Sequence, residues 1–265
     1  MIFYQRDNSK SGVNNDIRIF DNFHFMTHMH RDLELLFVLD GEIELTVENT
    51  VYIVKSGDMA LVFSNQIHAY ASPTPSKVLI HVFSPDNVRS FIRAIGDRVG
   101  VTPVFHCDEI IRTYYYHCLI EKDFQSPLAI KSYLYMICDR YLDSIPLVDA
   151  STVSDSILHK MLHYVAYHFR ENITLSEISE ALGYEPHYLS RVFGNATGIN
   201  LKRYINQYRI DYAKYRLSES TDTVTEIALS CGFQSIRNFN RVFLENEGTT
   251  PQAYRNHTIK QKPNK

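Results

Sequence analysis

Four side chains in the first third of the chain have the types and spacing of ligands for a transition metal. His28 and His30 are separated by one residue, Glu34 follows after three more, and His68 lies further along the chain. Imidazole nitrogens and a carboxylate oxygen in such a set can hold Fe, Mn, Zn or Ni, which would suit an oxygenase or an isomerase. Metal chemistry is therefore one interpretation of this segment.

The same side chains also suit a pocket for an uncharged polar molecule. Their ring nitrogens, carboxylate and neighbouring hydroxyl groups could donate and accept hydrogen bonds to a polyol such as a sugar. The alternative is that several of them are exposed or bonded to the backbone. We favour a pocket with no metal and no cofactor, and its candidate ligand-binding residues are His28, His30, Glu34, His68, Tyr70 and His81.

A second group of candidates lies in a segment that the chain carries almost twice. The stretch "TLSEISEALGYEPHYLSRVFGNATG" is followed, from Thr223, by "TVTEIALSCGFQSIRNFNRVFLENEG". Each copy begins Thr-x-x-Glu, the pattern of a capping box at a helix start. Each then has a glycine, Gly183 or Gly232, suited to ending that helix. Two short helices joined by such a turn predict a helix-turn-helix, whose second helix enters the DNA major groove.

The two copies differ on the exposed face of the second helix. His187 and Ser190 in the first copy give way to Arg237 and Asn240 in the second, while Arg-Val-Phe is kept. This is expected if each helix reads different base edges. A hairpin duplicated only for packing is the alternative. The base-edge candidates are His187, Ser190 and Arg191 in the first copy and Arg237, Asn240 and Arg241 in the second.

Three further groups of DNA contacts are expected around these helices. Arg191 and Arg241 can each bind guanine O6 and N7 bidentately, although a phosphate contact or an internal salt bridge would use the same side chain. Ser235 could cap the second reading helix or contact phosphate. The basic spacer between the copies, residues 201–217, is expected to form a connecting helix that offers phosphate or solvent contacts from Lys202, Arg203 and Arg209.

The elements that carry the first group are predicted to be strands. Runs rich in Val, Ile, Leu and Phe between residues 33 and 63 are broken by turn signals such as Asp40-Gly41. The segment 42–47 alternates polar and apolar residues, as a half-buried strand does. An Asp-Gly between two such runs predicts a hairpin. Regularly spaced turns favour a closed barrel or a sandwich.

From Ser84 the apolar period becomes helical. Two longer helices are expected, roughly at 107–122 and 126–144, with apolar stripes that could either pack on their own domain or pair two protomers. Residues 143–155 contain a proline, small residues and no clear period, which predicts a linker. Beyond it the chain is expected to be helical to about Asn256.

Charge, cysteine usage and hydropathy limit the class of protein. Residues 151–265 contain 14 Lys and Arg against 11 Asp and Glu, whereas residues 1–150 contain 13 against 19. Only the second half is therefore suited to nucleic acid. The widely spaced cysteines predict reduced thiols rather than disulfides. No apolar run reaches the length of a membrane helix and the N-terminus lacks a signal-peptide pattern, so a cytoplasmic protein with no membrane partner is expected.

The segment from about Ile157 to Arg255 resembles the AraC-type transcription regulators. Its run "IALSCGFQSIRNFNRVFLENEGTTPQAYR" has the family order I-A, G-F, F-x-R-x-F and G-x-x-P-x-x-Y-R. Arg237 and Asn238 stand where the family more often has a small polar residue and an aromatic, and Glu185 stands at a usual Ser or Thr cap. The resemblance implies two helix-turn-helix units joined by a central helix, with reading helices about one turn of DNA apart.

The first half resembles the cupin barrels. His28-x-His30, Glu34 and Gly41 match the first metal-binding motif of that fold, and Gly57-Asp58 with His68 resembles the second. Ser64 and Gln66 stand where cupins usually have Pro and Gly. In AraC-type regulators such a domain is a sensor, in which these positions support the barrel or line an effector pocket.

These observations predict a two-domain, non-enzymatic regulator. We expect an all-β cupin-like barrel with added helices for effector sensing and dimerisation at 1–145, a linker at 146–156, and an all-α DNA-binding domain with two helix-turn-helix units joined by a central helix at 157–258. The expected function is activation of carbohydrate uptake or catabolism genes, with DNA, a small-molecule effector such as a sugar, RNA polymerase and a second protomer as partners. The alternatives are a metal-dependent cupin enzyme fused to a DNA-binding domain and a regulator without a ligand.

Overall fold

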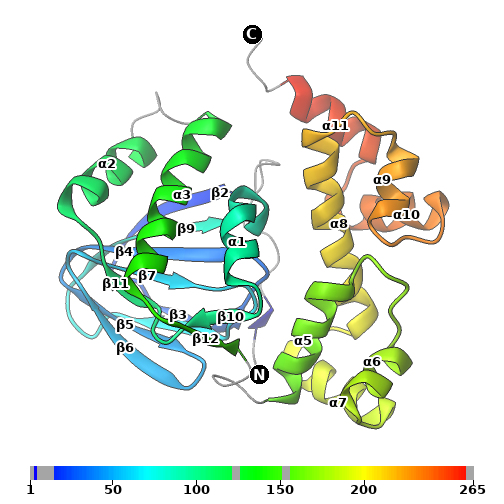
Figure 1. Cartoon of the computed structure of the whole chain (residues 1–265), viewed down its shortest axis with the longest axis horizontal. Helices are drawn as coiled ribbons and strands as arrows, with labels where there is room; N and C mark the ends of the chain where they lie inside the picture. Colours follow the sequence, from blue (N-terminus) through cyan, green and yellow to red (C-terminus); the bar gives the residue numbers. More distant parts are fainter. Residues whose placement is uncertain (1–2, 5–14, 121–125, 151–155, 261–265) are drawn as a thin grey trace. The chain divides into compact units, whose positions relative to one another are not determined.

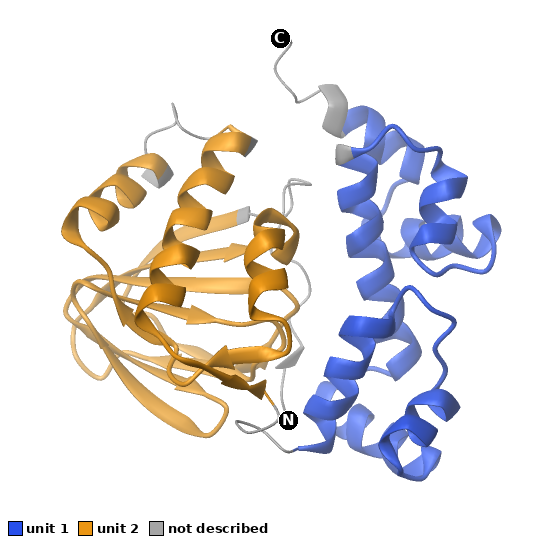
Figure 2. Ribbon diagram, in the orientation of Figure 1, with its two compact units in different colours: residues 1, 156–265 blue, residues 2–155 orange. Residues whose placement is uncertain are grey.

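The chain folds into two compact units that are described separately. The computed structural model describes residues 3–4, 15–120, 126–150 and 156–260. One unit runs from Ile2 to Asp155 and the other from Ser156 to Lys265 (Figure 2). Among the described residues, no helix has both the length and the apolar character needed to cross a membrane.

Two five-stranded sheets form the first unit (Figure 1). Sheet A has, in spatial order, β1 (Phe3–Tyr4), β3 (Phe25–Met29), β8 (His68–Ala71), β5 (Glu42–Val47) and β6 (Thr50–Lys55). Sheet B has β11 (Val104–His106), β7 (Asp58–Val62), β4 (Leu33–Asp40), β9 (Lys77–Phe83) and β2 (Asn15–Asp21). All described strand pairs in these sheets are antiparallel except β1 with β3.

Successive side chains along the strands of sheet B point to opposite faces, so its apolar side chains are divided between two cores. Leu36 and Val38 of β4 pack with Leu45 of β5 in a core shared by the two sheets. Leu33 and Leu35, which alternate with them, belong to a second core on the opposite face of sheet B. Because both faces are covered, β4 is a nearly continuous apolar run, and its one buried charge, Glu34, points toward sheet A.

Helices supply the second layer over sheet B (Figure 1). The 3₁₀ helix η1 (Pro85–Val88), α1 (Arg89–Ile95), α2 (Glu109–Ile120) and α3 (Pro127–Ser144) lie within the segments predicted to be helical. Ser126 begins α3 by accepting a hydrogen bond from the Ala129 amide. The apolar stripe of α3 is buried in the core of its own unit, so it is not left for a partner, whereas α2 leaves Ile110 and Tyr114 exposed.

One strand lies in the segment predicted to be a linker. β12 (Leu147–Asp149) pairs antiparallel with β10 (Arg98–Gly100). Three residues are too few to show a recognisable alternation of polar and apolar side chains. A strand this short forms because of its hydrogen bonds to the partner strand. Residues 151–155 of the same segment and 121–125 near the predicted end of α2 lie outside the described residues. The domain bounds 1–145, 146–156 and 157–258 stay a prediction.

The second unit is all-helical and contains the two predicted helix-turn-helix units. α6 (Leu175–Leu182) with α7 (Pro186–Thr197) and α9 (Val224–Ser230) with α10 (Ile236–Glu247) are joined by α8 (Leu201–Glu219) and flanked by α5 (Ile157–His168) and α11 (Pro251–Lys260). The predicted fold class, a β barrel with added helices followed by this all-α arrangement, is confirmed.

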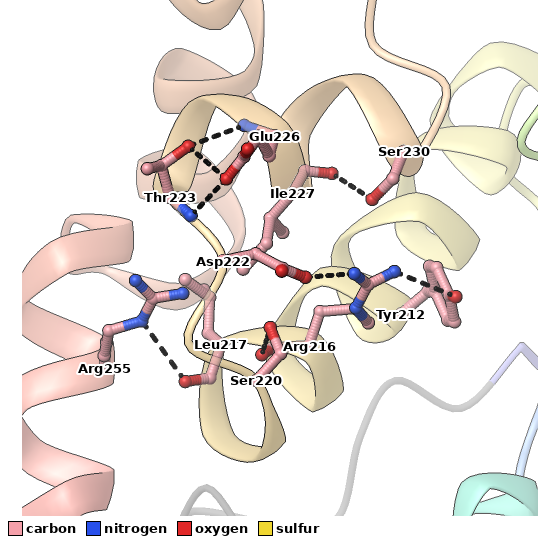
Figure 3. Close-up of polar contacts among 10 residues, drawn as sticks. All are labelled: Tyr212, Arg216, Leu217, Ser220, Asp222, Thr223, Glu226, Ile227, Ser230 and Arg255. Carbon is pink, nitrogen blue, oxygen red and sulfur yellow. Dashed lines mark hydrogen bonds and ion pairs between the residues drawn. The ribbon is translucent and has the colours of Figure 1, made fainter.

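Both predicted capping boxes are formed. In the second copy the Thr223 amide donates to Glu226 Oε2 at 2.8 Å, and the Glu226 amide donates to Thr223 Oγ1 at 3.2 Å (Figure 3). Thr174 and Glu177 make the same reciprocal bonds at the start of α6. Gly232 follows α9 with φ +88° in the left-handed region, where a β-carbon would be strained.

Candidate functional site

The two second helices, α7 and α10, present matching polar faces. Leu189 and Phe193 of α7 are buried, as are Phe239 and Phe243 of α10, which fixes one apolar edge of each helix in the core. The opposite faces are exposed, and they carry His187, Ser190 and Arg191 on α7 and Arg237, Asn240 and Arg241 on α10. The structure therefore brings the predicted base-edge candidates onto two solvent-facing helix surfaces.

The two arginines of these faces already have neighbours on their own helices. The Arg241 guanidinium donates to Glu245 Oε1 at 2.6 Å and to Asn238 Oδ1 at 2.9 Å. The Arg191 guanidinium carbon lies 5.8 Å from the centre of the Tyr188 ring. Exposed ion pairs are worth little, so DNA could replace these contacts at small cost. Ser235 accepts a bond from the Asn238 amide and so caps α10.

Of the predicted phosphate contacts on α8, two face solvent and one does not. Lys202 and Arg203 are exposed in the first turn of the helix. Arg209 is buried, and its Nε and Nη2 donate to the carbonyl oxygens of Phe169 at 2.7 Å and Glu171 at 2.8 Å. The prediction that Arg209 contacts phosphate is therefore wrong, because its side chain faces the end of α5 rather than solvent.

Five of the six predicted ligand-binding residues of the barrel meet in its interior. One ligand atom from each of His28, His30, Glu34 and His68 lies within 4.8 Å of the others, and all four side chains are buried. Tyr70 joins them by donating its hydroxyl proton to Glu34 Oε1 at 2.6 Å. These residues are called the barrel cluster below.

Backbone carbonyls orient the three rings of the barrel cluster. The Nδ1 atom of each histidine lies near a carbonyl oxygen two residues away, at 3.0 Å from Met26 for His28, 3.0 Å from Asp32 for His30 and 2.9 Å from Gln66 for His68. A carbonyl oxygen only accepts, so each Nδ1 carries a proton and each Nε2 is the remaining ring nitrogen. Sequence reasoning missed these partners because main-chain atoms leave no side-chain signal.

The Nε2 atoms converge on the Glu34 carboxylate. Glu34 Oε2 lies 2.9 Å from His30 Nε2 and 3.6 Å from His68 Nε2. Burial alone would raise the pKa of Glu34, but its hydrogen bond with His30 and the nearby His68 ring hold that pKa well below the ordinary value. Burial would lower the pKa of His30, and its bond to Glu34 raises it instead. Burial and the nearby His68 lower the pKa of His28 to about 3, so His28 is neutral at pH 7.

His81 is separate from the barrel cluster. It lies on β9 opposite Leu35 and faces the helices, where its Nδ1 is 2.6 Å from the Tyr115 hydroxyl of α2. Burial lowers its pKa to about 3, which keeps the ring neutral at pH 7. The expectation that His81 lines the same pocket as His28 and Glu34 is therefore corrected by the alternation of side chains along β9.

Comparison with known proteins assigns both units. Residues 178–257 match the helix-turn-helix domain family and residues 23–83 match the cupin domain family. The chain therefore carries a helix-turn-helix domain and a cupin domain, the pair that its resemblance to the AraC-type transcription regulators implies. The barrel cluster lies on strands of the cupin match and just beside them, and α7 and α10 lie within the helix-turn-helix match.

Several relatives of the chain are named as transcriptional regulators. An uncharacterised HTH-type transcriptional regulator of Staphylococcus aureus (strain MRSA252) is 26% identical over 230 residues, which are 83% of this chain and 31% of that protein. The chain thus spans about a third of the length of that relative. The HTH-type transcriptional activator RhaR of Escherichia coli O139:H28 (strain E24377A / ETEC) is 23% identical over 249 residues, 87% of each protein. The solved structure of ToxT from Vibrio cholerae has 16% identity, a TM-score of 0.43, and covers 92% of this chain and 98% of its own.

The residues of the barrel cluster fit the metal ion that a cupin fold implies. His68 Nε2 is buried and has no hydrogen-bond partner among the described residues. His30 Nε2 faces a carboxylate oxygen, and the neutral His28 ring has its Nε2 available as a lone-pair donor. Three imidazole nitrogens and one carboxylate oxygen are a donor set for Mn, Fe, Co, Ni, Cu or Zn. Metal-binding histidines usually donate their other ring N–H to a group such as a backbone carbonyl, as the three rings do here.

Proposed function

We propose that this regulator binds double-stranded DNA through α7 and α10, each placed in a major groove about one helical turn from the other. The observation that supports this is the matched pair of exposed arginines, Arg191 and Arg241. Each lies on the exposed face of a helix whose apolar edge is buried in the core. A guanidinium in that position can bind guanine O6 and N7 together. His187, Ser190, Arg237 and Asn240 supply the differing contacts, and Lys202 and Arg203 contact phosphate.

The test is selection of a binding site from random duplex DNA, followed by affinity measurements on arginine variants. Arg191→Ala and Arg241→Ala should each weaken binding and alter a different half of the selected site. Arg18→Ala is the matched control, because Arg18 is an equally exposed, ion-paired arginine of the other unit. If the two variants bind the selected site as the Arg18→Ala protein does, the assignment of the reading helices is wrong.

The barrel is proposed to sense a small molecule, and the regulated genes are proposed to serve carbohydrate uptake or catabolism. Support for activation is the similarity to the transcriptional activator RhaR along 87% of both chains. Support for a polar effector is the set of donors and acceptors in the barrel cluster. Activation would require contact with RNA polymerase. A thermal-shift screen of the full chain against sugars and sugar phosphates tests the effector class, and no shift with any of them would contradict it.

A homodimer is also proposed, with α2 as the contacting helix. Ile110 and Tyr114 are exposed on α2, whereas the stripe of α3 is used within the unit. Light scattering of the full chain would show the mass of two chains, and Ile110→Glu should halve it. An unchanged mass in that variant would place the contact elsewhere.

A second candidate function of the barrel is metal binding. The observation that favours it is the convergence of three Nε2 atoms and one carboxylate oxygen, with His68 Nε2 left without a hydrogen bond. An untagged chain should then carry about one transition-metal ion per chain when analysed by mass spectrometry for metals. A protein that neither retains a metal nor takes one up after dialysis against a chelator would exclude this function.

A further inference from the structure

The ligands of the barrel cluster come from both sheets. His28 on β3 and His68 on β8 are cross-strand neighbours in sheet A. Glu34 is on β4 at the centre of sheet B, between β7 and β9. His30 lies in the short connection between β3 and β4. An ion held by all four would therefore connect the two sheets across the inside of the barrel.

Tyr70 fixes the carboxylate that crosses between the sheets. It lies two residues after His68 on β8, so both side chains point to the same face of sheet A. Its hydroxyl donates to Glu34 Oε1 at 2.6 Å, whereas Oε2 faces the imidazole nitrogens. The hydrogen bond thus occupies one carboxylate oxygen and leaves the other for the ring side of the cluster.

We propose that the barrel cluster is a structural metal clasp, in which one divalent transition-metal ion ties sheet A to sheet B and Tyr70 holds Glu34 as a one-oxygen ligand. This rests on the metal binding proposed above and adds the role of the ion and of Tyr70. The four ligand side chains are at most 5% exposed, so an ion held by them would be enclosed within the barrel. Structural sites are closed and add their binding free energy to folding.

The effect of the ion on stability follows from the state of the cluster without it. Glu34 and His30 then form a buried ion pair, and His68 Nε2, which lies 3.6 Å from Glu34 Oε2, is buried without a hydrogen bond. An unsatisfied buried polar atom destabilises the fold, and a buried pair is weak support for it. Binding of the ion satisfies all of these atoms at once, so the metal-loaded barrel should resist unfolding more than the metal-free barrel.

The experiment uses the untagged full chain, dialysed against a chelator and then titrated with Zn²⁺ or Co²⁺. Calorimetry should give one site per chain, and the melting temperature should rise by several degrees on loading. Hydrogen exchange of β3, β4 and β8 amides should slow on loading, with no change in α5–α11. Tyr70→Phe should weaken metal affinity by about 10–100-fold, as loss of a hydrogen bond to a ligand does.

The matched control is Tyr115→Phe, which removes another buried tyrosine hydroxyl with a 2.6 Å bond, on the opposite face of sheet B. It should leave metal affinity unchanged. Absence of any binding, or binding unaffected by Glu34→Gln, overturns both the metal site and the clasp. Stoichiometric binding that leaves the melting temperature and the exchange of β3, β4 and β8 unchanged overturns the clasp alone. Equal affinities of the Tyr70→Phe and Tyr115→Phe proteins overturn the role of Tyr70. The exchange measurement needs only the wild-type chain, so it holds even if a variant does not fold.

Discussion

Arg241, which is proposed to read DNA, is held by neighbours on its own helix. Its guanidinium is bonded to Asn238 and Glu245, one turn away on either side along α10, yet the side chain remains 58% exposed. The neighbours restrict its rotamers without burying its charge. Asn238 stands where the resemblance places an aromatic more often, so this restraint is a property of this chain.

At this position Arg241→Ala should weaken binding to a selected site by about 1–3 kcal/mol and relax the preference at one base pair. The reason is the loss of two parallel hydrogen bonds to one guanine. Fluorescence anisotropy with the selected duplex and its single-base variants measures both effects. Glu245→Ala is the companion variant, and it should bind at least as tightly as the wild type because it removes a competing acceptor. A uniform loss over all base variants would identify a phosphate contact instead.

His81 makes the stability of the barrel depend on pH. Burial lowers its pKa to about 3 from 6.5 in the unfolded chain, so between those values the unfolded state binds a proton that the folded state does not. Stability is therefore present above pH 6.5 and is lost as the pH falls through the window below it. The slope from one such group is up to about 1.4 kcal/mol per pH unit.

His81→Gln should reduce this acid sensitivity. Glutamine keeps a partner for the Tyr115 hydroxyl but does not titrate, so the variant should lose up to about 2 kcal/mol less than the wild type between pH 7 and pH 5. Urea unfolding of chelator-treated protein at the two pH values gives the difference. Parallel losses in both proteins would show that His81 takes up its proton without unfolding.

At the scale of elements, α8, the end of α5 and the turn after α9 meet where the two helix-turn-helix units join. Arg209 of α8 donates to the carbonyl oxygens of Phe169 and Glu171 beyond the end of α5, and its guanidinium carbon lies 5.7 Å from the centre of the Phe233 ring. A β-carbon on Gly232 would come within 2.7 Å of the Arg170 carbonyl oxygen. The turn of the second helix-turn-helix is thus packed directly on the end of α5. This contact fixes the two helix-turn-helix units relative to one another within the helical unit.

Arg209→Lys should therefore loosen the spacing of the two reading helices. Lysine cannot reach two carbonyl groups with a planar fork, so at least one buried acceptor loses its bond. The wild type should lose affinity when one base pair is inserted between the half-sites, because the second half-site is then shifted and rotated, and the variant should lose less. Arg203→Lys is the control, because Arg203 lies on the same helix but is exposed. Equal penalties in all three proteins would contradict the role of Arg209.

At the scale of the whole molecule, the chain carries a barrel that is proposed to bind a ligand and a helical unit that is proposed to bind DNA. Coupling between them requires that the ligand bind with different affinity to two arrangements of the chain. Such coupling free energies typically change affinity by about 5–150-fold. The chain between β12 and α5 connects the two units covalently.

Metal loading should change the DNA affinity of the full chain and leave that of a fragment covering residues 156–260 unchanged. The fragment contains every residue proposed to contact DNA and none of the barrel cluster. Titration of one labelled duplex, with chelator or with Zn²⁺, compares the two proteins. An equal response in both proteins would show that the ion acts on the DNA or on the helical unit. No response in either protein would show that metal binding does not regulate DNA binding.

Much of the helical unit could be predicted from local signals. Thr-x-x-Glu, the following glycine and the i, i+4 apolar edge each act over one or two helical turns, so they determine α6, α7, α9 and α10 before any distant contact is considered. Polar positions left over on α7 and α10 were then identifiable as the exposed face. The convergence of His28, His30, Glu34 and His68 was also signalled, through their resemblance to the metal-binding motifs of the cupin fold.

Only the tertiary structure decided which side of an element a single residue uses. His81 and Val82 are adjacent on β9, and the pairing of Glu34 with Val82 sends His81 to the helices, a fact that depends on register between strands distant in sequence. The sequence predicted Arg209 to lie on an exposed basic face of α8, but in the folded chain the end of α5 covers its side chain. The sequence by itself determined the helices, their caps and the ligand types, because these follow from interactions between near neighbours. Burial and strand register needed the folded chain, because they arise from contacts between residues far apart in sequence. The carbonyl groups behind each imidazole are only two residues away, but they needed the folded chain because main-chain atoms leave no side-chain signal.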